Sequence, residues 1–213
     1  MSVKGLLFDL DGVIVFTDKF HYQAWKQMAD KMGIYFDEEI NNRLRGVSRM
    51  DSLDIILEKY DGEPLTQEKK EQLAFEKNET YRELLNTMNP SDVTKEVRDT
   101  LRELRRRGYR IALGSSSKNA KFILKQVELM EAFDQVSDGN NIKKSKPDPE
   151  VFLKGAEYLG LDPVECAVVE DAYAGIDAAK AAGMVAVAIG DAISDSKADI
   201  RLGTFKDMLK YFK

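Results

Sequence analysis

The sequence predicts an α/β fold, in which a doubly wound, Rossmann-like parallel-sheet core is interrupted by an inserted all-helical cap. Short apolar runs alternate with helical patterns beyond about residue 90, which is typical of a parallel sheet covered by helices on both faces. Residues 18–86, by contrast, carry only helical periodicity. We therefore expect the core to comprise residues 1–14 and 90–213, and the cap, including its hinge linkers, to comprise residues 15–89.

The first strand is expected at residues 3–8, a largely apolar run that stops at an Asp-Leu-Asp-Gly turn. Helical spacing in the next segment is carried by Phe20, Trp25, Met28, Ala29 and Met32. A second helix is expected after Ser48, and a third should run from Thr66 to about Asn86. No strand pattern interrupts this part of the sequence, so the insertion should be helical throughout.

Strand and helix patterns alternate along the rest of the chain. Further strands are expected at residues 110–113, 167–169 and 185–189. Helices are expected at residues 93–107, 120–127, 149–159 and 174–182. We interpret the basic run Arg105-Arg106-Arg107 as a solvated helix end. This alternation is the pattern of consecutive βα units.

Composition and charge exclude several classes of function. The 213 residues include 43% hydrophobic and 32% charged residues, with a net charge of -5 that disfavours non-specific binding to nucleic acid. No run approaches the roughly 20 apolar residues of a membrane span. The single cysteine, Cys166, lies in an apolar run and permits no disulfide within the chain. We expect a cytoplasmic monomer that binds neither nucleic acid nor membranes.

Side chains suited to chemistry recur where the expected strands end. They are Asp9 and Asp11 after the first strand, Ser115 to Asn119 after the second, Glu170 and Asp171 after the third, and Lys146 between the last two groups. Because parallel-sheet proteins place their sites at the carboxyl ends of strands, these groups should meet. Clustered carboxylates repel one another unless a cation lies among them, and oxygen-only ligands favour Mg²⁺ over zinc.

Phosphoryl transfer is the chemistry that this set favours. One aspartate can attack phosphorus, and a second, two residues on, can transfer protons to or from the attacking or leaving oxygen. A lysine and serine hydroxyls can hold the phosphoryl group. Each feature alone also has a structural interpretation; the run from Ser115 to Ser117, for example, suits a helix N-cap. Their occurrence at successive strand ends favours the functional interpretation.

These motifs resemble the four signature motifs of the haloacid dehalogenase superfamily, and the position of the insertion resembles that of its helical-cap subgroup. The matching residues are Phe8-Asp9-Leu10-Asp11-Gly12-Val13, Ser115, Lys146-Pro147-Asp148-Pro149 and Glu170-Asp171. Within that subgroup the chain is similar to the β-phosphoglucomutases. That similarity rests on His21-Tyr22-Gln23-Ala24-Trp25, Arg45-Gly46-Val47-Ser48-Arg49, Asp51-Ser52-Leu53, Lys77-Asn78 and Ser116-Ser117-Lys118-Asn119.

The resemblance implies a role for each core position. Asp9 would be the nucleophile that becomes an aspartyl phosphate, and Asp11 the general acid and base. Asp9, the backbone carbonyl of Asp11, Glu170 and Asp171 would hold Mg²⁺. Ser115 and Lys146 would hold the transferring phosphoryl group.

The resemblance also implies how the substrate is bound. Its other phosphate would be held by Arg49 together with Ser117, Lys118 and Asn119, and Ser116 would be a further phosphate-binding residue. The sugar pocket would be formed by Thr17, His21, Trp25, Arg45, Gly46, Val47, Ser48, Ser52 and Lys77. One position departs from the family pattern, because Phe16 precedes Thr17 where an aspartate is common. Packing or closure of the hinge can therefore differ here.

The reaction that the resemblance implies is interconversion of β-D-glucose 1-phosphate and glucose 6-phosphate. It would pass through the aspartyl-phosphate enzyme and β-glucose 1,6-bisphosphate, with a small-molecule sugar phosphate as the partner. A sugar-phosphate phosphatase with the same aspartyl-phosphate chemistry is the main alternative. A non-catalytic phosphosugar-binding module is the alternative of another class, and the presence of both Asp9 and Asp11 argues against it.

Overall fold

The computed structural model describes residues 2–44 and 47–213, so the predicted sugar-pocket residues Arg45 and Gly46 lie outside the described residues. The chain divides into two compact units. Residues up to 16 together with 89–213 form one, which we call the α/β unit, and residues 17–88 form the other, the helical unit. The doubly wound core with a helical insertion is confirmed as the fold class.

A six-stranded parallel sheet runs through the α/β unit in the order β3-β2-β1-β4-β5-β6. The strands are β1 (Gly5–Phe8), β2 (Arg110–Gly114), β3 (Gln135–Ser137), β4 (Cys166–Glu170), β5 (Val185–Ala188) and β6 (Ile200–Arg201). From β1 the strand order proceeds through β2 to β3 on one side and through β4 to β6 on the other. The point where the order reverses, between β1 and β4, is where doubly wound sheets place ligands.

The register of the sheet aligns the carboxyl ends of the three central strands, β2, β1 and β4. Phe8 of β1 lies opposite Leu113 of β2 and Val169 of β4. The residue after Phe8 is Asp9, and the residue after Val169 is Glu170, so both carboxylates emerge at the same edge of the sheet. The position of these residues in the sequence and the pairing of the strands therefore place both carboxylates at one edge of the sheet.

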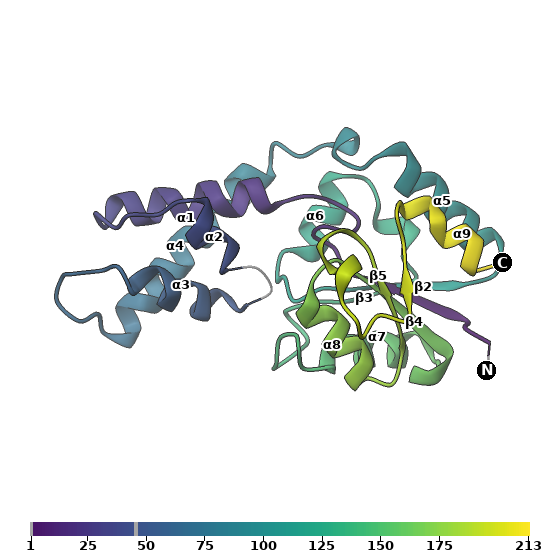
Figure 1. Ribbon diagram of the computed structural model, residues 1–213. Coiled ribbons are helices and arrows are strands. Elements are labelled where there is room, and N and C mark those ends of the chain that lie inside the picture. Colours follow the sequence, from purple (N-terminus) through teal and green to yellow (C-terminus); the bar gives the residue numbers. More distant parts are fainter. Residues whose placement is uncertain (1, 45–46) are drawn as a thin grey trace. The chain divides into compact units, whose positions relative to one another are not determined.

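Helices cover both faces of the sheet (Figure 1). They are α5 (Lys95–Arg106), α6 (Ala120–Gln126), α7 (Glu150–Leu159), α8 (Tyr173–Ala181) and α9 (Met208–Tyr211). Successive strand residues point to opposite faces. Leu7 accordingly packs in a buried cluster with Phe152 of α7 and Ile176 of α8, whereas Phe8 contacts Phe205, in a short 3-10 turn before α9, with ring centroids 5.6 Å apart.

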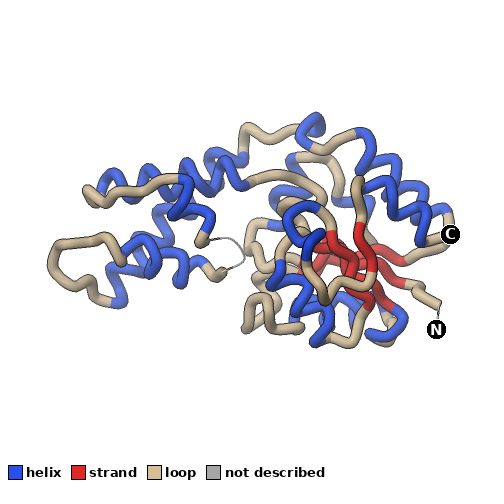
Figure 2. Tube along the Cα trace, viewed as in Figure 1, coloured by secondary structure: helices blue, strands red, loops and turns tan. Residues whose placement is uncertain are grey.

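The helical unit contains α1 (Asp18–Lys31), α2 (Glu38–Asn42), α3 (Arg49–Leu57) and α4 (Gln67–Leu85). All the regular structure described within it is helical, as Figure 2 shows. Ser48 and Thr66 cap α3 and α4 by accepting hydrogen bonds from the main-chain N–H groups of Asp51 and Lys69, which confirms the two predicted starts. A buried apolar cluster including Trp25 and Leu53 holds the helices together. Among the described helices, none is both long and apolar enough to cross a membrane.

Four short elements were not expected from sequence: β3, β6, α2 and α9. Strands of three and two residues are too short to show a periodic pattern, and both contain exposed positions. Neighbouring strands supply their hydrogen bonds, so tertiary pairing and not local sequence decides that they form.

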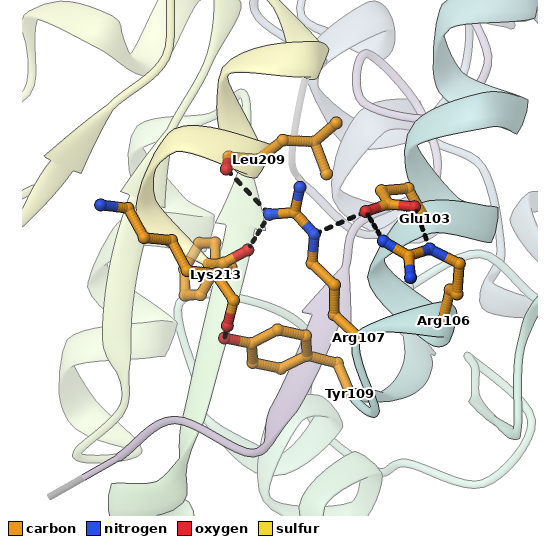
Figure 3. A network of polar contacts seen from close by, with 7 residues as sticks. Glu103, Arg106, Arg107, Tyr109, Leu209 and Lys213 are labelled. Carbon is orange, nitrogen blue, oxygen red and sulfur yellow. Dashed lines mark hydrogen bonds and ion pairs between the residues drawn. The ribbon is translucent and has the colours of Figure 1, made fainter.

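The interpretation of Arg105-Arg106-Arg107 as a solvated helix end is wrong for Arg107 (Figure 3). Its guanidinium donates to the main-chain oxygens of Leu209 and Phe212, at 2.9 and 2.6 Å, and to Glu103. Tertiary partners at the C-terminal end of the chain, which a helical pattern does not show, account for the difference.

Candidate active site

Three carboxylates converge at the carboxyl edge of the sheet. Asp9 follows β1, Glu170 is the last residue of β4, and Asp171 comes next. Each offers a carboxylate oxygen, and these oxygens lie within 4.8 Å of one another. Asp9 is 9% exposed and Glu170 only 1%, so the group is largely shielded from water.

Lys146 joins this cluster from the loop before α7. Its Nζ lies 2.5 Å from Asp9 Oδ1 and also donates to Glu170 Oε1. The same nitrogen lies 4.7 Å from the centre of the Phe152 ring. The lysine is therefore held in the cluster by two ion pairs and an aromatic contact, and it orients the Asp9 carboxylate.

Electrostatic repulsion within the cluster is only partly relieved by the lysine. Burial, reinforced by the Asp9 charge and opposed by Lys146, raises the pKa of Glu170 to about 7. Burial together with the charges of Asp9, Glu170 and Asp11 raises the pKa of Asp171 to about 8. Burial opposes a charged lysine, but Asp9 and Glu170 outweigh it and raise the pKa of Lys146 above its ordinary value.

This donor set fits Mg²⁺. Three carboxylates share one ammonium group, so negative charge is in excess, and every donor in the group is an oxygen. Magnesium prefers oxygen ligands and commonly takes one or two carboxylates in protein sites. Asp9, Glu170 and Asp171 could hold the ion directly or through water.

Two glycines allow the carboxylates to approach the main chain. A Cβ at Gly12, which has φ +82°, would lie 1.9 Å from Asp171 Oδ2. A Cβ at Gly175 would lie 2.1 Å from Glu170 Oε1. Sequence reasoning included Gly12 in a motif but missed Gly175, for which the only signal was a glycine inside a helical pattern.

Asp11 lies close to the cluster without being part of its tight group of three. Its main chain forms a bridge with Val15, and the N–H of Gly12 donates to Val15 O at 2.7 Å. Its charge contributes to the raised pKa of Asp171. The predicted roles of Asp11, as acid and base and as carbonyl ligand, stay predictions.

The residues predicted to hold phosphate follow β2 as a compact loop, residues 115–119, which we call the phosphate loop. Ser115 Oγ accepts from the N–H of Ser117, and Ser117 Oγ accepts from the N–H of Asn119, both at 3.2 Å. Ser116 Oγ is buried and has no hydrogen-bond partner among the described residues. A hydroxyl that accepts from the backbone keeps its own proton for a ligand.

In the helical unit, the predicted residues His21, Trp25 and Lys77 form one cluster with Tyr81. Lys77 Nζ lies 3.0 Å from His21 Nδ1 and 4.4 Å from the centre of the Trp25 ring. His21 stacks on Tyr81 with ring centroids 4.0 Å apart, and the Tyr81 hydroxyl donates to Thr17 Oγ1 at 3.1 Å. Five side chains are thus held in one arrangement.

A basic trio, His21, Arg49 and Lys77, results from this packing. Arg49 donates to Asn78 Oδ1 at 2.8 Å. Burial and the nearby Arg49 charge lower the pKa of Lys77 to about 7. Burial, with Lys77 and Arg49, also lowers the pKa of His21 well below its usual value. The Arg49 charge thus disfavours protonation of Lys77 and His21, and a bound anion would favour it.

The other predicted cap residues differ in their surroundings. Ser48 Oγ caps α3 and also donates to Asp51 Oδ2 at 2.6 Å, which gives it a structural role. Ser52 is buried, whereas Val47 is 41% exposed. Their predicted contact with a sugar stays a prediction.

A model of the haloacid dehalogenase-like hydrolases matches residues 3–183. The chain belongs to this family. It is 40% identical to a β-phosphoglucomutase of Bacillus subtilis (strain 168) over 189 residues, which cover 88% of this chain and 84% of that protein. Together with the carboxylate cluster, these findings identify an enzyme of the haloacid dehalogenase-like hydrolase family.

Other similar proteins of the family include both mutases and phosphatases. A fructose-1-phosphate phosphatase of Escherichia coli (strain K12) is 35% identical over 86% of this chain and 94% of its own. The crystal structure of a β-phosphoglucomutase from Clostridium difficile is 36% identical, with a TM-score of 0.90 over 98% of this chain and 95% of that chain. Family membership therefore leaves two reactions to consider.

Proposed function

We propose that the protein is a phosphomutase that interconverts β-D-glucose 1-phosphate and glucose 6-phosphate. The partly buried guanidinium of Arg49, which donates to Asn78 Oδ1 and lies near Lys77, is the observation that carries this proposal. A mutase must bind a bisphosphate intermediate, so it needs cationic groups for a second phosphate besides those that serve the transferred one. The similarity to β-phosphoglucomutases supports the same conclusion.

In this proposal an oxygen of Asp9 forms a bond to phosphorus while the bond from phosphorus to the leaving oxygen breaks. Lys146, bound to Asp9 Oδ1, holds the carboxylate in orientation and leaves its other oxygen for attack. Asp11 gives a proton to the leaving oxygen and takes one from the sugar hydroxyl when the phosphoryl group returns. Magnesium, held by Asp9, the Asp11 carbonyl, Glu170 and Asp171, would offset the charge on the phosphoryl oxygens.

Phosphate and sugar binding are assigned to the remaining predicted residues. Ser115 and Lys146 hold the transferred group. Ser117, Lys118 and Asn119, with Arg49, hold the second phosphate, and Ser116 is a further phosphate-binding residue. Trp25 and Lys77 contact the sugar. Binding energy from the second phosphate can then favour the sugar over water, because water cannot use those contacts.

Product analysis tests the proposal. The enzyme is incubated with β-D-glucose 1-phosphate, Mg²⁺ and a trace of glucose 1,6-bisphosphate, with Asp9→Asn as a control for contaminating activity. Glucose 6-phosphate should form in the amount of substrate consumed. Release of inorganic phosphate without glucose 6-phosphate would refute the mutase assignment.

A sugar-phosphate phosphatase is the second candidate, favoured by the identity of 35% to the fructose-1-phosphate phosphatase. In that case water takes the phosphoryl group from Asp9. The two candidates differ in the decay of the phosphorylated enzyme. A mutase phosphoenzyme should persist in water and disappear rapidly when β-D-glucose 1-phosphate is added, whereas a phosphatase phosphoenzyme should be lost at a rate that the sugar hardly changes.

A further inference from the structure

The loop after β3, residues 138–141, holds the phosphate loop by its main chain. The N–H of Ser115 donates to Ser137 O at 3.1 Å, which places the two loops side by side. The N–H of Gly139 donates to Ser117 O at 3.2 Å, and Asn140 Nδ2 donates to Lys118 O at 3.0 Å. Two consecutive carbonyl groups of the phosphate loop are thus held by the neighbouring loop, which we call the β3 loop.

Gly139 is needed for this approach. A Cβ at this position would lie 2.4 Å from Ser116 O and 2.9 Å from Lys118 N, both main-chain atoms. Contacts this short cannot be relieved by rotating a side chain. Any larger residue would therefore push the two loops apart.

The buried carboxylate of Asp138 holds the β3 loop through hydrogen bonds. It is only 1% exposed, and its Oδ1 accepts from the main-chain N–H of Asn140 at 2.9 Å and from Asn140 Nδ2 at 3.1 Å. The carboxylate thereby fixes the amide that reaches Lys118 O. Burying a carboxylate is costly, and Asp138 Oδ2 has no hydrogen-bond partner among the described residues. The two hydrogen bonds from Asn140 are the contacts that the structure shows for the Asp138 carboxylate group.

The contacts form a continuous path to the phosphate-binding hydroxyls. Lys118 O and the N–H of Asn119 belong to one planar peptide group and point in opposite directions. Fixing Lys118 O therefore also fixes the N–H that donates to Ser117 Oγ. The N–H of Ser117 in turn donates to Ser115 Oγ. Both serine oxygens accept from the backbone, so their protons are directed to other acceptors.

We propose that Asp138 and Asn140 are positioning residues for phosphoryl-group binding. They act through the phosphate loop, whose main chain and serine hydroxyls they hold in the arrangement that receives phosphate oxygens. The proposal rests on the phosphate-binding role given to residues 115–119 under the proposed function. It goes beyond that function by adding residues that do not themselves touch the ligand.

Binding of inorganic phosphate in the presence of Mg²⁺, measured by calorimetry on the full chain, tests the proposal. Asn140→Ala should weaken phosphate binding about tenfold, the effect of losing one hydrogen bond that supports the binding loop. Asn141→Ala is the matched control, because Asn141 bonds only within residues 137–141 in the contacts described, through Ser137 Oγ and the N–H of Asp138. It should change binding by less than about twofold.

Urea unfolding of the same variants separates positioning from general stability. A loss of stability in Asn140→Ala with unchanged phosphate binding would overturn the proposal, and so would equal weakening by Asn141→Ala. Gly139→Ala, which forces the loops apart, should weaken binding at least as much as Asn140→Ala. Failure of β-D-glucose 1-phosphate to yield glucose 6-phosphate would reject the mutase reaction alone, because the phosphate-binding comparison does not depend on it.

Discussion

At the scale of the residue, Asp9 combines three properties that a nucleophilic carboxylate needs. It is nearly buried, it is held by Lys146 at one oxygen, and it lies next to two carboxylates that can share a cation with it. Replacing one of its oxygens by an amide nitrogen changes the last two of these relations while hardly changing the volume of the side chain.

Asp9→Asn should reduce turnover of β-D-glucose 1-phosphate by roughly a thousandfold or more, because an amide cannot form the acyl phosphate. Circular dichroism should show an unchanged fold. Asp177→Asn is the matched control, since Asp177 pairs with Lys197 at the surface of the same unit. Retention of a few per cent of activity by Asp9→Asn would remove the nucleophile assignment.

Burial of Lys77 lowers the stability of the folded state. Because the same burial lowers the pKa of Lys77, the cost can be measured as a dependence of stability on pH. The folded state holds its pKa at about 7, whereas the unfolded chain has the ordinary value of 10.5. Between these values the unfolded state binds a proton that the folded state does not, so stability should rise with pH across this window. Lys77→Met should remove this pH dependence and raise the free energy of unfolding at pH 7.5, by at most about 4 kcal/mol, from which the loss of the Lys77 contacts is subtracted.

Urea unfolding at pH 7.5 and 9.5 measures both effects of Lys77→Met. Lys69→Met, an exposed lysine on the same helix, should have little effect at either pH. A variant Lys77→Met that is less stable than the parent at pH 7.5 would show that the contacts of Lys77 with His21 and Trp25 outweigh its desolvation.

At the scale of the element, α5 and the C-terminal helix α9 are joined through one side chain. Arg107 follows α5 and donates to two main-chain oxygens at the end of the chain, Leu209 O and Phe212 O, while Glu103 accepts from the other side of its guanidinium (Figure 3). The short α9 has only one turn, so it depends on such contacts and on buried Met208 for its stability.

Arg107→Ala should lower the free energy of unfolding by about 2 kcal/mol, because two carbonyl groups lose a charged donor. Arg102→Ala, within α5, is the control, since its side chain is 76% exposed and pairs with Asp99 at the surface. Thermal unfolding compares the two. A similar shift for both variants would show that the C-terminal contacts contribute nothing.

The elements that the sequence predicts are those with a pattern of their own. The helix from Thr66 to Asn86 could be bounded because a capping threonine and a long run of helix-forming residues lie within it. The strand β3 could not be predicted, because its three residues depend on pairing with β2. The meeting of Asp9, Glu170 and Asp171 follows from where strands end, whereas the contact of Asn140 with Lys118 depends on loop geometry that no motif records.

At the scale of the whole molecule, the carboxylate cluster that could hold Mg²⁺ should couple stability to pH. Glu170 and Asp171 have folded pKa values raised to about 7 and about 8. Without metal, the folded state therefore keeps protons that the unfolded state has lost, and stability should fall as pH rises from about 4 to 8. A cation competes with these protons, so its affinity should rise over the same range.

Mg²⁺ should therefore raise the melting temperature more at pH 8.5 than at pH 6. Differential scanning calorimetry with Mg²⁺ or EDTA, at matched ionic strength, measures the increment at each pH. The double variant Glu170→Gln, Asp171→Asn should lose most of it. An equal increment at both pH values, or one that persists in the double variant, would contradict a magnesium site at these carboxylates.

The central position of β1 has a consequence for how the chain folds. The strand lies within the first sixteen residues, yet its partners β2 and β4 follow only at Arg110 and Cys166. Closing such long loops is slow, whereas the contacts of the helical unit are between residues nearer in sequence. During synthesis β1 must therefore wait, unpaired, until β2, which begins at Arg110, has been made. The nascent chain exposes a β-prone segment throughout that time, which is the period of greatest risk for aggregation.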